Sequence, residues 1–103
     1  MNMKDREKAF ENKFAHDADL KFKAESRRNK MLAEWAAGLL GKSGSDAEAY
    51  AKDVVTSDLE EPGSEDVFRK VSGDLGSTSD ETTIRTKMAE LMKEAKAQIF
   101  DEA

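Results

Sequence analysis

The sequence MLAEWAAGLL, residues 31–40, is the densest apolar stretch of this 103-residue chain. Its apolar residues recur every three or four positions, which is the period of one face of an α-helix. The chain has one proline, and apolar and polar residues do not alternate over any length that a half-buried strand would need. We therefore expect this stretch to pack firmly as a helix and the whole chain to be all-α.

The helical period continues from this stretch toward the N-terminus. The residues that fall on one broad face are Phe10, Phe14, Ala24, Met31, Leu32, Trp35 and Leu39. Before Lys30 the segment is dense in charges, some of which attract and some repel at helical spacing, so its local support is modest. We predict one long first helix from about Lys4 to Leu40, with Trp35 as the core anchor.

Three further amphipathic segments follow. The second helix begins at Ser45 and ends before residues 60–63, which include the only proline. The third begins at Ser64. The fourth follows a capping box formed by Thr78 and Glu81. Their apolar faces are Ala47, Tyr50, Ala51, Val54, Val55 and Leu59, then Val67, Phe68, Val71 and Leu75, then Ile84, Met88, Leu91, Met92, Ala95 and Ile99. Four helices with short connections predict an up-and-down four-helix bundle.

The four predicted helices differ in length. The first would have about 35 residues and measure about 50 Å, against about 12 to 20 residues for the others. The N-terminal part of the first helix should therefore protrude or be mobile. We expect residues 1–20 to form a mobile segment and residues 21–103 to form the bundle.

The charge of the chain is unevenly spread. Net charge is −5, with nine Lys or Arg and six Asp or Glu in residues 1–30, against eight and sixteen in residues 31–103. The acidic body would repel a phosphate backbone, which argues against nucleic acid. No apolar run approaches the roughly 20 residues that span a bilayer, and the first residues lack the apolar core of a secretion signal. We expect a cytoplasmic protein, monomeric when free, that does not insert into a membrane.

Few residues suggest chemistry. Gly41-Lys42-Ser43 invites comparison with a phosphate-binding loop, but the required glycine five residues earlier is Ala36 and a helix precedes in place of a strand. Lys42 is thus only a weak candidate for ATP or ADP, and a helix C-cap is the favoured interpretation. No cysteine is present, and no histidine lies in the body of the chain to activate a serine. We expect no enzyme and no metal site.

His16 is the single histidine, with Asn12, Asp17 and Asp19 nearby. One histidine with surface carboxylates rarely makes a metal site, which needs three or more converging ligands. We interpret His16 as a solvated or interface polar residue.

Phe10 and Phe14 are the informative pair. At positions i and i+4 they either extend the core stripe or anchor an amphipathic helix in a partner's groove. The other predicted helices are too short to cover residues 4–20, which favours docking.

The run from Asp5 to Asp17, DREKAFENKFAHD, resembles the opening of the ζ-subunit family of the alphaproteobacterial F-type ATP synthase. The resemblance continues through Phe22-Lys23-Ala24-Glu25, Arg27-Arg28-Asn29-Lys30, Trp35-Ala36-Ala37, Leu40-Gly41-Lys42-Ser43, Ala49-Tyr50-Ala51-Lys52 and residues 65–71. It covers essentially the whole chain.

This resemblance implies a four-helix bundle that inhibits ATP hydrolysis by the catalytic head, peripheral to the inner membrane. Its mobile N-terminal helix would wedge between catalytic and rotor subunits. The residues that the resemblance and the charge pattern single out for that contact are Lys4, Asp5, Arg6, Lys8, Phe10, Lys13, Phe14 and His16. The alternatives are a nucleotide-sensing module and a regulator of some other protein partner.

Overall fold

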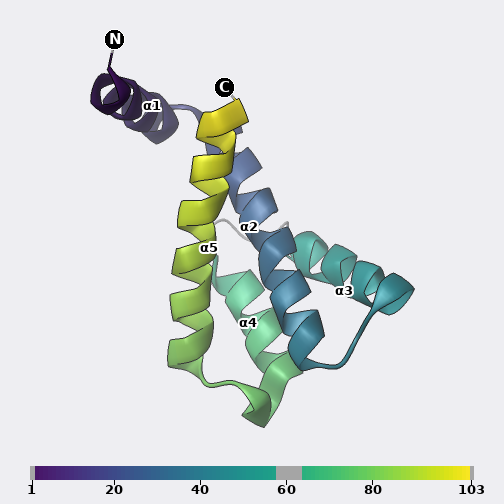
Figure 1. Ribbon diagram of the computed structural model, residues 1–103. Coiled ribbons are helices and arrows are strands. Elements are labelled where there is room, and N and C mark those ends of the chain that lie inside the picture. The colour runs from purple at the N-terminus through teal and green to yellow at the C-terminus, as the bar shows by residue number, and fades with distance from the viewer. Residues whose placement is uncertain (1, 58–63, 103) are drawn as a thin grey trace.

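The computed structural model describes residues 2–57 and 64–102. Within these ranges it has five α-helices, a single 3₁₀ turn and no strand (Figure 1). The elements are α1 (Met3–His16), α2 (Ala18–Leu39), α3 (Gly44–Ser57), α4 (Glu65–Leu75), η1 (Gly76–Thr78) and α5 (Glu81–Glu102). The all-α prediction is confirmed. None of the described helices has the length and apolar character to cross a membrane.

The prediction of one helix from Lys4 to Leu40 is wrong, because the chain breaks at Asp17. The Asp17 backbone is extended (φ −108°, ψ 105°), and its Oδ1 accepts hydrogen bonds from the backbone N–H groups of Asp19 (3.0 Å) and Leu20 (3.1 Å). Aspartate is among the best N-cap residues, so it starts α2 as a new helix. The described chain thus has five α-helices in place of the expected four.

A main core joins α2, α3, α4 and α5, and α2 and α5 run side by side through the molecule (Figure 1). Leu32, Val54, Val67, Val71 and Ile84 are fully buried there. The other buried members are Ala33, Ala36, Ala37, Tyr50, Phe68, Leu75, Met88 and Leu91. The members from α3, α4 and α5 lie on the apolar faces that the helical period predicts. Helix α2 differs, because beside Leu32 it buries Ala33, Ala36 and Ala37, whereas Met31 and Trp35 are only half-buried and Leu39 is exposed. Trp35 is only half-buried against this core, so it lines the edge and is not the central anchor.

The starts of α4 and α5 differ from the predicted caps. Ser64 precedes α4 but its side chain makes no capping hydrogen bond. Thr78 lies in η1, and Asp80 caps α5 in its place, with Oδ1 accepting from the Thr83 N–H at 2.7 Å. Hydrogen bonds from Thr83 hold the pKa of Asp80 below its ordinary value. The predicted contact of Leu59 and the break at residues 60–63 lie outside the described residues.

Candidate functional site

Helix α1 lies beside the C-terminal end of α5, and its axis runs in a different direction from that of α2 (Figure 1). Asn2 caps its first turn, because its Oδ1 accepts the Asp5 N–H at 2.9 Å. The apolar face of α1 is part of a second cluster, which is separate from the main core. This cluster has the buried residues Phe14, Ala24 and Ile99, with Phe10, Leu20 and Met92 packed against them.

Aromatic rings form the centre of the contact between α1 and α5. Phe10 lies 6.1 Å from Phe14 and 5.2 Å from Phe100, measured between ring centroids, and the Phe10 and Phe100 rings meet edge to face at 70°. Such pairs stabilise beyond the area they bury. The expectation that no helix is long enough to cover Phe10 and Phe14 is therefore wrong. The turn at Asp17 places α1 against α5, which runs as far as Glu102.

Charged side chains close the edges of this contact. Lys96 Nζ lies 4.5 Å from the centroid of the Phe14 ring and 3.7 Å from Glu11 Oε2. The guanidinium of Arg6 lies 5.2 Å from the centre of the Phe100 ring. Because Glu11 and Arg6 are exposed, each interaction contributes about 1 kcal/mol at most.

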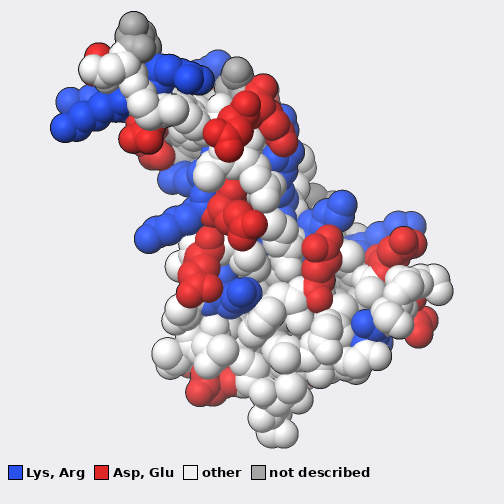
Figure 2. All heavy atoms as spheres, in the orientation of Figure 1, with Lys and Arg blue, Asp and Glu red and all other residues white. Residues whose placement is uncertain are grey.

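The residues predicted to bind a partner divide between two faces of α1. Phe10, Phe14 and Arg6 face α5. The other five are exposed to solvent: Lys4, Asp5, Lys8, Lys13 and His16. Figure 2 shows Lys and Arg side chains over α1, and Asp and Glu side chains near the C-terminal end of α5. The exposed face of α1 is therefore the basic one, and its aromatic face is covered within the chain.

Sequence reasoning missed the α5 side of this contact. Phe100 and Lys96 were not singled out, although they lie one turn apart and flank Ile99, the last residue of the predicted α5 stripe. Glu11 was read only as one charge among many. The one available signal was Phe100, which follows Ile99 at the end of the apolar stripe of the last helix. Helical periodicity does not say which other helix a side chain will contact.

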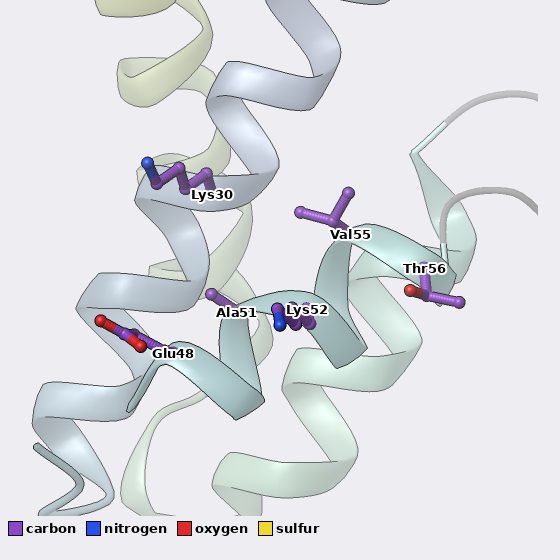
Figure 3. Close-up of a pocket in the computed structure, with 6 residues that line it drawn as sticks. All are labelled: Lys30, Glu48, Ala51, Lys52, Val55 and Thr56. Atoms are coloured by element: carbon purple, nitrogen blue, oxygen red, sulfur yellow. The ribbon is translucent and has the colours of Figure 1, made fainter. Parts of the chain in front are cut away.

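A hollow of about 530 Å³ lies between α2 and α3. Its lining residues are Lys30, Glu48, Ala51, Lys52, Val55 and Thr56 (Figure 3). In the close-up, Lys30 comes from α2 and the other five from α3. The polar lining residues are one carboxylate (Glu48), two lysines and one hydroxyl (Thr56), without a histidine or cysteine. No residue predicted to act in binding lines it.

The Lys42 candidate lies at another hollow, of about 370 Å³. Lys42 Nζ and Lys70 Nζ lie 5.9 Å and 5.6 Å from the centroid of the Tyr50 ring, with Asp53 and Asp74 also lining the space. Burial is the largest single cause that raises the pKa of Tyr50, and the nearby carboxylates of Asp74 and Asp53 raise it further. The Tyr50 hydroxyl makes no hydrogen bond of ordinary geometry. The negative charges of Asp53 and Asp74 would repel a phosphate group bound in this hollow. Nucleotide binding at Lys42 stays a prediction. Among the described residues, no three His, Asp or Glu side chains are placed to hold a metal ion.

Comparison with known proteins decides the family. The family model described as ATPase inhibitor subunit zeta matches residues 1–98. The chain belongs to that family. As a zeta-family member it is a regulatory, non-catalytic subunit that inhibits the ATP synthase, in agreement with the resemblance seen in its sequence.

A solved structure has a similar fold. It is a solution NMR structure of a protein 54% identical to this chain, with a TM-score of 0.73. The alignment covers 82% of this chain and 99% of that one. A search of curated proteins finds no match.

Proposed function

We propose that α1 is the inhibitory element and that it wedges between the catalytic and rotor subunits of the ATP synthase. The observation that carries this proposal is the break at Asp17, which makes α1 a separate helix outside the main core. Residues 1–20 would act as a mobile segment and residues 21–103 as the bundle that carries it. An amphipathic helix with anchors at i and i+4 suits a partner's groove.

The two faces of α1 would have different roles in this complex. Phe10 and Phe14 would supply the apolar anchors, and the exposed Lys4, Lys8 and Lys13 would pair with acidic groups of the catalytic head. Asp5, Arg6 and His16 would line the same contact. Interface cores favour aromatic residues, whereas charges at the rim act on association rate and register. The protein would thus be cytoplasmic, held near the inner membrane by the synthase, and monomeric when free.

The test is ATP hydrolysis by the purified catalytic head. The full chain should inhibit, and a version lacking residues 1–19 should not. Full-length Lys8→Glu, which reverses an exposed charge of α1, should weaken inhibition without unfolding the protein, as circular dichroism would check. Phe22→Ala is the matched control, because Phe22 is 60% exposed and belongs to neither cluster. Inhibition by the truncated chain equal to that of the full chain would reject α1 as the inhibitory element.

A further inference from the structure

The aromatic face that would dock on the partner is already occupied in the free protein. Phe10 lies edge to face on Phe100, and Phe14 packs with Ile99 beneath the Lys96 ammonium group, with 9% of its surface exposed. The same side chains cannot contact α5 and a partner's groove together. Intramolecular packing and docking therefore exclude each other.

The contact between α1 and α5 is shallow and borders an open groove. A groove of about 450 Å³ remains between the two helices, lined by Glu7, Phe10, Glu11, Lys93, Lys96, Ala97 and Phe100. This groove is open to solvent, so the side chains at its rim bury less apolar surface than those of the main core. The α1–α5 contact is thus the weaker of the two packings.

Helix α1 can also move without disturbing the rest of the fold. Only Asp17, in an extended conformation, joins it to α2, and no α1 residue belongs to the main core. Opening would expose the apolar side chains of the second cluster but none of the main core, and local units of this kind open at less than the global unfolding free energy.

We propose that the C-terminal end of α5 is an autoinhibitory latch: Phe100 and Lys96 hold Phe10 and Phe14 of α1 and compete with the partner for them. This inference rests on the proposed function of α1 and adds its regulation. A protein whose binding-competent state is only partly populated binds with an affinity reduced by that fraction. Breaking the latch should therefore strengthen inhibition.

The first experiment is Phe100→Ala in the full chain, with Phe22→Ala as the matched control. Losing the Phe10–Phe100 pair and the Arg6 contact should raise inhibitory potency by up to about tenfold. Amide exchange should quicken across residues 4–16 and stay unchanged in the main core. Equal potency of Phe100→Ala and the unaltered chain would overturn the latch, and so would weaker inhibition, which would make Phe100 a binding residue.

The second experiment closes the latch covalently. The chain has no cysteine, so Glu11→Cys with Lys96→Cys provides the only two thiols, at side chains that meet in the structure. Joining them with a short bis-maleimide should abolish inhibition, while the same variant left unlinked should inhibit. Full inhibition by the linked protein would overturn the latch.

The two proposals fail in different ways. If neither the unaltered chain, nor Phe100→Ala, nor the unlinked cysteine variant inhibits, the proposed function itself is wrong and the latch has nothing to compete with. If all three inhibit equally and linking changes nothing, the proposed function stands and the latch is wrong.

Discussion

The main core and the second cluster are built from the same kinds of residue but differ in depth. In the main core, four helices surround fully buried aliphatic side chains such as Leu32, Val54 and Ile84. In the second cluster, the C-terminal ends of α1 and α5 and the first turns of α2 enclose Phe14, Ala24 and Ile99. The charged side chains of Lys96 and Glu11 lie at its edge. A core that is buried on all sides unfolds as a unit, whereas a cluster at the tip of a helix pair can open alone.

This difference suits an inhibitor subunit. A stable body keeps the protein folded whatever the state of α1. In the latch that we propose, the shallow cluster would let α1 leave at small cost when a partner binds α1 more tightly. The separation of α1 from the main core depends on the helix break at Asp17, because in one continuous helix α1 could not move independently of α2.

The largest expected effect is on the main core. Leu32→Ala should lower the free energy of unfolding by about 3 kcal/mol, since it leaves a cavity among fully buried side chains. Urea unfolding followed by circular dichroism measures this. Leu39→Ala is the control: Leu39 is 43% exposed, and its loss should change stability by less than about 0.5 kcal/mol.

A smaller global effect is expected at the second cluster. Phe14→Ala should lower the free energy of global unfolding by about 1 kcal/mol, less than a core phenylalanine, because α1 opens before the rest unfolds. Amide exchange should show α1 unprotected while the protection of α5 before residue 95 persists. A loss as large as that of Leu32→Ala would show that the two clusters form one cooperative unit.

The link between the two regions depends on one cap. Asp17→Ala should cost about 1 kcal/mol through loss of the bonds to Asp19 and Leu20. Alanine also favours helix, so α1 and α2 should tend to merge, seen as helical Cα chemical shifts at residues 16–18. Asp17→Asn keeps an acceptor and should leave both stability and the shifts nearly unchanged. An extended residue 17 in the alanine variant would contradict the role of the cap.

The smallest expected effect is that of pH. A hydrogen bond from Arg27 (2.5 Å), together with Lys23, holds the pKa of Glu102 below its ordinary 4.5, and Arg85 does the same for Glu65. Because the folded pKa values are lowered, these pairs stabilise the protein above pH 4.5 and lose that effect as pH falls through the lowered values. Urea midpoints from pH 7 to 3 should therefore fall only below about 4.5. Glu102→Gln should show a shallower fall; an identical profile would mean that this pair does not contribute.

Much of the fold was predictable from the sequence. The apolar faces of α3, α4 and α5 follow from helical spacing, because a side chain's direction on a helix depends only on its position along it. Gly41, with φ of +74°, ends the first bundle helix as predicted. The family also follows from the sequence, since the N-terminal run resembles the zeta family and the family model matches residues 1–98.

The sequence singled out the α1 residues of the proposed site but not the side chains that surround them. Phe10 and Phe14 stand out by spacing alone, yet spacing assigned them equally to a core and to a partner. The break at Asp17 was missed because an aspartate in a charged helical stretch reads as one more surface charge. Its capping role depends on the backbone turn that it stabilises.

The sequence determined which faces are apolar, where charges gather and which family the chain belongs to, because these depend on residue order alone. Only the tertiary structure decided that α1 turns at Asp17 and that Phe100 and Lys96 of α5 cover Phe10 and Phe14. Residues 10 and 100 are far apart along the chain, and no local rule pairs them. Their contact exists because burying the aromatic face of α1 against the nearest free helix end lowers the free energy more than leaving it in water.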